Sequence, residues 1–261
     1  MNFPSHSSAQ RQDALDLCLD VHPEDPVLDL AVTHALLREV ASGERGATVR
    51  VFRPGPTLAL GRLDALQAEC GAAAHVGRAH GYVPAVRLGG GRAVVYDRGS
   101  VQLDLVIAQR DGLAGTRTRF AYVERLLLET FGEIGIDARG GELPGEYCAG
   151  RWSVHAAGLK LAGSAQRVVR GAALVTTIIP VEGGQHLRNA LTDIYRTLAI
   201  AWRPSTCGAV EDLSEDIDAR AMVDAVVSTL ARHFELHARA LALSSLSDAQ
   251  ALRPVHTTSV A

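Results

Sequence analysis

The sequence predicts an α+β fold with a mixed β-sheet. Strand-like segments follow one another in clusters, whereas a doubly wound parallel fold alternates strands strictly with helices. Segments with the helical period of apolar residues lie before, between and after these clusters. The chain has 261 residues, of which 47% are hydrophobic. It can therefore bury a large core in one domain, with or without a small appendage.

The predicted helices begin with a segment that carries its own start and stop signals. Asp25 suits an N-cap and Pro26 a first helical turn. Apolar residues then recur on one helical face, and Gly43 can end the helix. The other predicted helices are a segment through Leu63, Leu66 and Cys70 and the ranges 120–134, 187–198 and 219–241.

The predicted strands are short and bounded by glycine, proline and polar residues. In the 101–107 segment, apolar residues alternate with Gln102 and Asp104, which predicts one buried face and one polar face. Ala157 and Gly158 are typical of a tight turn between two strands. The full set is 47–53, 57–60, 83–88, 93–96, 101–107, 136–139, 152–155, 159–162, 166–170 and 172–179.

The ends of the chain are expected to be less ordered than its centre. Chain ends fray unless packing holds them. We expect residues 1–22 to form a partly flexible arm, residues 23–244 a single domain, and residues 245–261 a flexible C-terminal tail.

Composition argues against several classes of function. The formal net charge is −3, which disfavours a nucleic-acid partner and a basic membrane-binding face. The first twenty residues lack the apolar segment of a signal peptide, and no apolar run approaches the roughly 18 residues that cross a bilayer. The four cysteines form no CxxC pair, so neither a disulfide framework nor a metal site is expected. We therefore expect a cytoplasmic protein.

Lys160 is the only lysine in the chain. Lysine and arginine together number 26, so 25 are arginine (26 − 1). A GC-rich genome explains the arginines, but arginine cannot replace lysine where a compact ammonium or a deprotonatable amine is needed. Leu159 and Leu161 flank Lys160 in a predicted strand, so its side chain points to the opposite face from both. A leftover surface lysine is the alternative to a functional one.

Cys148 lies in the loop 140–150, which is rich in glycine and proline. A thiol in such a loop is more exposed than one on an apolar helix face, and an exposed thiol is a candidate nucleophile. Cys18 and Cys70 lie among leucine and alanine at helical spacing, where burial is expected. Cys207 has no charged neighbour in the sequence, and its role stays open.

Three consecutive glycines, Gly89 to Gly91, follow Arg87. Glycine lets a backbone approach a ligand closely, its N–H groups can face an anionic oxygen, and arginine can clamp an anion. A glycine hairpin between two strands is an equally good interpretation. The spacing excludes Walker A and Rossmann loops, because a strand follows where those motifs need a helix.

Together these segments resemble the superfamily of lipoate–protein ligase A, octanoyltransferases and biotin ligases, over about residues 25 to 200. The order fits: a glycine block after arginine, an Ala-Val-Val-Tyr-Asp strand, then Gly-x-Lys-x-Ala-Gly-Ser-Ala-Gln. The resemblance implies a biotin/lipoate ligase-like catalytic domain, with a largely antiparallel sheet flanked by helices. It implies that Lys160 contacts an acyl carbonyl or acyl-adenylate. It also implies substrate binding by Arg87, Gly89, Gly90, Gly91, Ala93, Tyr96, Asp97, Gly163, Ser164 and Ala165.

Within this superfamily the sequence is most similar to the cysteine-dependent octanoyl or lipoyl transferases. The segment 146–150, Glu-Tyr-Cys-Ala-Gly, resembles their Tyr-Cys-Pro-Gly loop, with Ala149 in place of proline. Ligases typically carry Asn-Asp upstream of the lysine, where this chain has Trp-Ser-Val-His at 152–155. The biotin ligase glycine–arginine signature is not matched, which disfavours biotin.

The resemblance implies a mechanism and partners. Cys148 would carry an octanoyl or lipoyl group as a thioester to a lysine of a lipoyl domain, with no cofactor required. The donor would be an acyl carrier protein or glycine cleavage H protein, and the acceptors the lipoyl domains of 2-oxoacid dehydrogenase complexes. Domain 23–244 would be an acyltransferase domain.

Each catalytic group has an expected role in that mechanism. A thiol ordinarily has a pKa of about 8.5, which an ammonium such as Lys160 lowers. Lys160 would also shuttle the proton. Backbone N–H groups near Gly90 and Gly91, or near Gly163 and Ser164, would hold the oxyanion.

Two alternatives remain open. One is a ligase that uses ATP and Mg²⁺ to form lipoyl-AMP from free lipoate. The other is a non-catalytic homologue that binds acyl groups or lipoyl domains. An octanoyl increment on Cys148 would identify the transferase, a requirement for ATP and free lipoate would identify the ligase, and measurable turnover would exclude the non-catalytic homologue.

Overall fold

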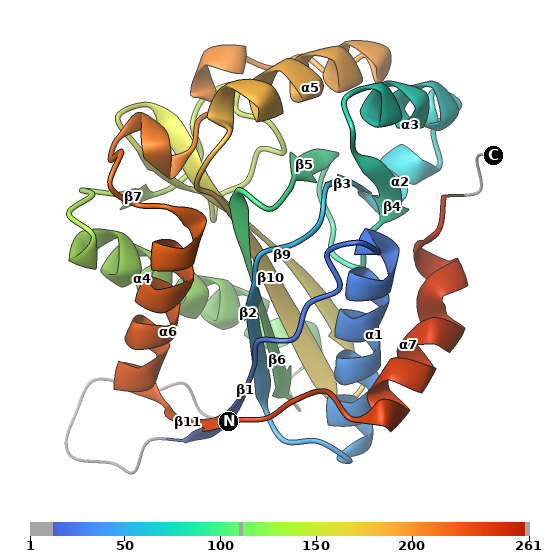
Figure 1. Cartoon of the computed structure of the whole chain (residues 1–261), viewed down its shortest axis with the longest axis vertical. Coiled ribbons are helices and arrows are strands. Elements are labelled where there is room, and N and C mark those ends of the chain that lie inside the picture. The colour runs from blue at the N-terminus through green and yellow to red at the C-terminus, as the bar shows by residue number, and fades with distance from the viewer. Residues whose placement is uncertain (1–12, 110–111, 259–261) are drawn as a thin grey trace.

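The fold is built on a large mixed β-sheet, seen nearly edge-on in Figure 1. The computed structural model describes residues 13–109 and 112–258. Within them, the sheet has eight strands. Neighbouring strands pair antiparallel along the series β2, β6, β10, β9, β8 and β7, whereas β1 pairs parallel with both β2 and β11. Their order is β11 (Glu235–Ala238), β1 (Ala14–Cys18), β2 (Thr48–Phe52), β6 (Ser100–Ala108), β10 (Ala172–Pro180), β9 (Leu159–Val169), β8 (Val154–Ala156) and β7 (Arg139–Gly140). The expected α+β class with a largely antiparallel sheet is confirmed.

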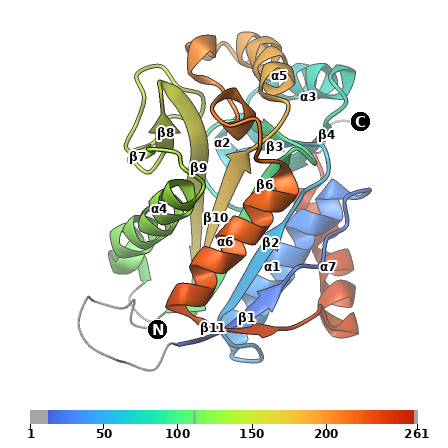
Figure 2. The same cartoon turned by 60° about the vertical axis from the view of Figure 1, so that its left-hand side comes forward.

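Helices cover both faces of this sheet. One face packs against α1 (Pro26–Ser42), with α7 (Leu243–His256) beside it. The other face packs against α4 (Thr116–Glu133) and α6 (Ala219–His233). Figure 2 shows α4 and α6 in front of the strands and α1 and α7 behind them. The sheet is therefore the middle of three layers.

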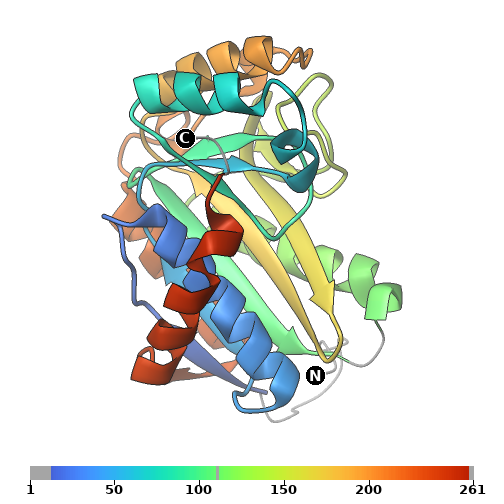
Figure 3. The ribbon, with the colours of Figure 1, turned by 90° about the vertical axis from the view of Figure 1, so that its right-hand side faces the viewer.

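A smaller sheet closes one end of these layers. Among the described residues it contains β4 (Val83–Val86), β3 (Thr57–Leu60) and β5 (Val94–Tyr96), in that order. The helices α3 (Cys70–Ala79) and α5 (Gly184–Thr197) run side by side above it, and the short α2 (Arg62–Ala65) follows β3 (Figure 3). The turn that holds the three glycines leaves this small sheet after β4 and returns to it in β5.

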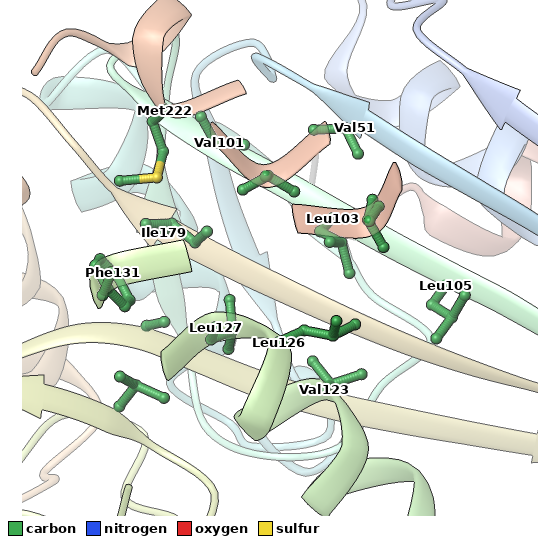
Figure 4. Close-up of a cluster of buried hydrophobic side chains, with 14 of the residues drawn as sticks. Val51, Val101, Leu103, Leu105, Val123, Leu126, Leu127, Phe131, Ile179 and Met222 are labelled. Atoms are coloured by element: carbon green, nitrogen blue, oxygen red, sulfur yellow. The ribbon is translucent and has the colours of Figure 1, made fainter. Parts of the chain in front are cut away.

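The main hydrophobic core fills the space between the sheet and α4 with α6. Val101, Leu103 and Leu105 of β6 point into this space, where Leu127 and Phe131 of α4 meet them (Figure 4). Each such side chain contributes about 1.5–3 kcal/mol when fully buried. Burial on this face of the sheet therefore contributes a large part of the stability of the fold.

The start and end of α1 agree with the prediction. The Asp25 carboxylate accepts the Leu28 N–H at 3.2 Å, Pro26 occupies the first turn, and Gly43 ends the helix with φ of 84°. The Ala157–Gly158 turn is also confirmed, with φ of 48° and 79°. These signals are local, so sequence alone was sufficient to place them.

The polar face predicted for β6 is present, but it is buried like the apolar one. Gln102 and Asp104 lie on it, and α1 covers it. Asp104 accepts hydrogen bonds from Thr33 of α1 at 2.6 Å and from Thr176 of β10 at 2.5 Å, and Gln102 donates to it at 2.9 Å. The alternation of apolar and polar residues in β6 therefore separates two buried sides, an apolar core on one face and a polar network under α1 on the other.

Several predicted boundaries also need correction. The two strands expected at 159–162 and 166–170 are one strand, β9, because β10 pairs with it along residues 163–169 and bridges the small residues between them. The helix expected over 219–241 ends at His233, where Phe234 turns the chain into β11. The helix expected through Leu63 and Cys70 is two helices, and the strand expected at 136–139 is β7. The strand expected at 83–88 ends at Val86.

The domain extends further than predicted in both directions along the chain. Residues 14–18 of the expected arm form β1, and most of the expected C-terminal tail forms α7. Ala249 and Leu252 of α7 are buried against α1, so this segment is packed up to the last described residue. Residues 1–12 and 259–261, also assigned to the arm and tail, lie outside the described residues. Within residues 13–109 and 112–258, no helix combines the length and apolar character that crossing a membrane requires.

Candidate active site

A cavity of about 1150 Å³ lies where the small sheet, the large sheet and α1 meet. The glycine block and the cysteine loop form one part of its wall, and β9 and β10 form another. The third part of the wall comes from α1, through Leu30, Thr33, His34 and Leu37, and from residues 254–257 at the end of α7. The lining as a whole is mostly apolar, and charged groups gather near Cys148, which suits a ligand with one apolar and one reactive end.

The backbone of Cys148 is held in an unusual conformation at this wall. Its φ is 43°, a left-handed conformation that costs a non-glycine residue roughly 1–3 kcal/mol. The Cys148 N–H donates to the Tyr195 hydroxyl at 2.8 Å, and that hydroxyl donates to the Ala93 carbonyl at 2.9 Å. Burial raises the pKa of the Tyr195 phenol, so it remains a neutral hydroxyl that can hold both groups.

The glycine block lies directly against the Cys148 sulfur. A Cβ atom on Gly91 would come within 2.7 Å of Sγ and within 2.8 Å of Arg87 Nη2, and Gly91 has φ of 92°. A Cβ on Gly89 would lie 2.7 Å from the Cβ of Ala165 on β9. A side chain at Gly89 or Gly91 would therefore collide with neighbouring protein atoms, so these two positions require glycine.

Arg87 is the cation that contacts the thiol. Its Nη2 lies 3.6 Å from Cys148 Sγ and also donates to the carbonyls of Gly90 and Arg92, both at 2.7 Å. Its Nη1 donates to the Ala59 carbonyl at 3.2 Å. The guanidinium thus fixes the glycine block and places a positive charge beside the sulfur.

Lys160 lies on the other side of Cys148, where it binds the backbone. Its Nζ donates to the carbonyls of Tyr147 at 2.9 Å and Cys148 at 3.0 Å, and to Glu146 Oε1 at 3.2 Å. These three bonds use every N–H of the ammonium. Its side chain is 2% exposed, and Gly163 leaves room for it, since a Cβ there would lie 3.1 Å from Lys160 Cε.

Glu146 completes this arrangement, although nothing in the sequence singled it out from the rest of the cysteine loop. Its Oε1 accepts from Lys160, from the Ser153 hydroxyl at 2.5 Å and from the Gly150 N–H at 3.1 Å. Its Oε2 accepts the Leu143 N–H at 3.3 Å. Its partners include two backbone N–H groups of the same loop, which any residue type supplies, so the sequence of the loop does not reveal this role.

Most of the residues expected to bind substrate lie together at the cavity. Ala93 and Asp97 are not among the residues that line it. The Ala93 carbonyl binds Tyr195, and the Asp97 carboxylate accepts the Gly99 N–H at 2.9 Å in the turn after β5. The lining set contains Arg87, Gly89, Gly90, Gly91, Tyr96, Cys148, Lys160, Gly163, Ser164 and Ala165.

The other cysteines are buried, as expected for Cys18 and Cys70. Burial raises the pKa of the Cys207 thiol to about 12, so Cys207 is a poor nucleophile. Across the part of the chain that the structure describes, Cys148 is the one thiol that is partly exposed. No group of three His, Cys, Asp or Glu side chains there could hold a metal ion.

A histidine pair joins α7 to the cavity wall, which sequence reasoning missed. His256 Nδ1 lies 2.8 Å from the Val86 carbonyl, and its Nε2 lies 3.1 Å from His34 Nδ1 of α1. Since Nδ1 of His256 donates to a carbonyl, its Nε2 is the acceptor for His34. Burial lowers the pKa of both histidines, that of His34 to about 4, so both are neutral near pH 7.

Known proteins are similar to this chain in fold and in part of the sequence. The family described as the lipoyl protein ligase A/B catalytic domain matches residues 25–235. An octanoyl-GcvH:protein N-octanoyltransferase of Exiguobacterium sibiricum is 34% identical over 169 residues, 63% of this chain and 60% of that protein. A lipoyl-GcvH:protein N-lipoyltransferase of Listeria monocytogenes is 27% identical over 179 residues, 67% of this chain and 63% of that protein. The chain thus spans less than two thirds of the length of both relatives.

Solved structures extend the similarity over nearly the whole chain. The crystal structure of lipoate-protein ligase A bound with ATP matches with a TM-score of 0.75 and 20% identity. The match covers 92% of this chain and 94% of the other. At this identity the likeness establishes the fold.

Proposed function

Because the chain belongs to the lipoyl protein ligase A/B catalytic domain family, we propose that it transfers an octanoyl or lipoyl group to a lipoyl-domain lysine through a Cys148 thioester. The observation that carries this proposal is the partly exposed Cys148 thiol at the cavity wall, with the Arg87 guanidinium 3.6 Å from its sulfur. A thiolate is the nucleophilic form of cysteine, and an adjacent cation favours it. The names of the two relatives, an N-octanoyltransferase and an N-lipoyltransferase, support the same class of reaction.

The two cations beside Cys148 have different roles in this proposal. Arg87 stabilises the thiolate, a role that the sequence had led us to expect of Lys160. Lys160, whose Nζ contacts the carbonyls of the cysteine loop, handles the proton. The backbone around Gly90 and Gly91 lies beside the sulfur and supplies the N–H groups that hold the oxyanion.

The cavity accommodates the acyl chain between α1 and the large sheet. Gly163, Ser164 and Ala165 keep β9 slim along this wall, which suits a chain that lies against it. Tyr96 and Gly89 line the same space. Ala93 and Asp97 support the wall from behind, through Tyr195 and through the turn after β5.

The proposed partners are proteins that carry the acyl group. The names of both relatives contain GcvH, which supports an octanoylated or lipoylated glycine cleavage H protein as donor. An octanoyl acyl carrier protein is the alternative donor. The lipoyl domains of 2-oxoacid dehydrogenase complexes are the proposed acceptors. Transfer between such proteins requires no cofactor, whereas a ligase would require ATP and Mg²⁺.

The decisive experiment looks for the acyl-enzyme. The purified protein is incubated with octanoyl carrier protein or octanoyl-H protein, without ATP, and its intact mass is measured. We expect an octanoyl increment that maps to Cys148, that is lost in Cys148→Ser, and that persists in the matched control Cys207→Ser.

Other outcomes contradict the proposal in distinct ways. Full transfer by Cys148→Ser would exclude the thioester. A requirement for ATP and free lipoate would establish the ligase alternative. Binding of octanoyl-H protein without any turnover would identify a non-catalytic homologue.

A further inference from the structure

A buried ion pair lies directly behind the cysteine loop. The side chains of Glu146 and Lys160 are 0% and 2% exposed, and their charged atoms are 3.2 Å apart. Two buried charges are tolerated when they neutralise each other and their remaining hydrogen-bonding positions are filled. Both conditions hold here, since Lys160 has three acceptors and Glu146 has four donors.

The pair holds the Lys160 ammonium in one place. The Glu146 carboxylate and the carbonyls of Tyr147 and Cys148 accept its three N–H groups. Lys160 therefore begins the reaction as an acid, on the wall of the cavity and bonded to the carbonyl of Cys148.

An acid at this position matters for one class of donor. When an acyl group leaves a lysine side chain, the departing nitrogen needs a proton, because an amide anion is a very poor leaving group. When it leaves a thioester, the departing thiolate needs none. The protonation of Lys160 thus distinguishes donors that carry the acyl group on nitrogen from donors that carry it on sulfur.

We propose that Glu146 is a positioning residue that holds the Lys160 ammonium behind the cysteine loop and thereby adapts this enzyme to N-acyl-lysine donors. This inference rests on the proposed function above. In the first half-reaction the Cys148 thiolate forms the C–S bond, the C–N bond breaks, and Lys160 Nζ gives its proton to the leaving nitrogen. In the second, the acceptor amine forms a C–N bond, the C–S bond breaks to restore the thiolate, and the amine proton returns to Lys160.

The test compares two donors with one acceptor. The amide donor is H protein bearing N-octanoyl-lysine, the thioester donor is octanoyl acyl carrier protein, and octanoylation of a lipoyl domain is followed by mass. General acid–base catalysis contributes typically about 10²–10⁴-fold. We expect Glu146→Gln to lower kcat/KM for the amide donor by a factor in that range. For the thioester donor the expected loss is less than about tenfold, since its first half-reaction needs no acid.

Ser153→Ala is the matched control. It removes a hydrogen bond to the same Oε1 atom of Glu146 but leaves the ion pair in place. If the ion pair acts as proposed, Ser153→Ala affects both donors equally, while Glu146→Gln changes their ratio. Equal losses for both donors in Glu146→Gln would show that Glu146 only supports the loop and would overturn the proposal.

A double-mutant cycle keeps the proposal testable if Glu146→Gln is unstable. Lys160→Met removes the acid, and the variant Glu146→Gln/Lys160→Met also removes the buried carboxylate, so neither charge is left unpaired. If Glu146 acts through Lys160, the double variant is no slower with the amide donor than Lys160→Met alone. A further loss in the double variant would contradict this. Failure of the wild-type protein to form the Cys148 acyl-enzyme would instead overturn the proposed function itself.

Discussion

The two faces of the large sheet bury side chains of opposite character. On the α4 and α6 face, Val101, Leu103 and Leu105 of β6 belong to the main hydrophobic core. On the α1 face, Asp104 accepts hydrogen bonds from Thr33 and Gln102, and Gln102 lines the cavity. The same strand thus supports the core on one face and a polar network beside the cavity on the other.

This difference indicates a division of labour between stability and function. The apolar face holds few polar groups, among them the Thr130 and Thr229 hydroxyls, which bond each other at 2.9 Å, and its apolar contacts need no particular hydrogen-bond geometry. The polar face places its groups beside the cavity, and each of its buried groups must be satisfied. Substitutions on the two faces should therefore have different consequences.

The largest effect on stability is expected on the apolar face. Leu103→Ala removes buried volume between β6 and α4, and such changes cost about 2–5 kcal/mol. Chemical denaturation measures this loss, while transfer activity per folded molecule should stay near that of the wild type. Leu63→Ala, at a position that is 70% exposed, is the control and should change the free energy of unfolding by less than about 0.5 kcal/mol. Equal costs at the two positions would contradict the assignment of Leu103 to the core.

A smaller loss of stability, with a larger loss of activity, is expected on the polar face. Asp104→Asn replaces a carboxylate that accepts from Thr33 and Thr176, and hydrogen bonds to a charged group contribute about 1.5–3 kcal/mol. Because Thr33 and Thr176 line the cavity, KM for the acyl donor should rise as well. Denaturation and donor titration measure the two effects. An unchanged KM would show that the network serves stability alone.

The smallest expected effect is a dependence of the free energy of unfolding on pH, caused by His34 of α1 and His256 of α7. Burial lowers the pKa of His34 to about 4 and lowers that of His256, so the unfolded chain binds more protons than the folded chain between about pH 6.5 and pH 4. Stability from the neutral pair is complete above about pH 6.5 and is lost as the pH falls through this window.

The His256→Gln variant tests this expectation. Its melting temperature should be lower than that of the wild type at about pH 7.5, and the difference should shrink at about pH 5. His237→Gln, at an exposed histidine of β11, is the control and should follow the wild type. Parallel pH profiles for His256→Gln and the wild type would contradict the role of the pair.

Local and compositional signals predicted much of the fold and part of the site. The ends of α1 follow from Asp25 and Gly43, which act on their own turns of the chain. Lys160 stood out because it is the only lysine, and Cys148 because its loop is rich in glycine. These features need no knowledge of distant contacts.

The parts that were missed depend on contacts that only the folded structure assembles. The partners of Glu146 lie within 14 positions of it, but the conformation of the cysteine loop is what brings Lys160, Ser153 and the backbone groups together. The buried stripe of α7 consists of Ser245, Ala249, Leu252 and His256, a helical spacing with only one large apolar residue. Such a stripe gives a weak periodic signal, so the segment was predicted to be a tail.

The His34–His256 contact also bears on the order in which the protein assembles. It joins residues separated by 222 positions in the chain, and α7 closes the same region of the cavity wall that α1 begins. Forming a contact between residues so far apart in sequence costs chain entropy before the contact itself contributes any favourable free energy. We therefore expect this contact to form late in folding. The cavity should therefore be completed after the core between the sheet and α4, and a local detachment of α7 would open it while that core stays intact.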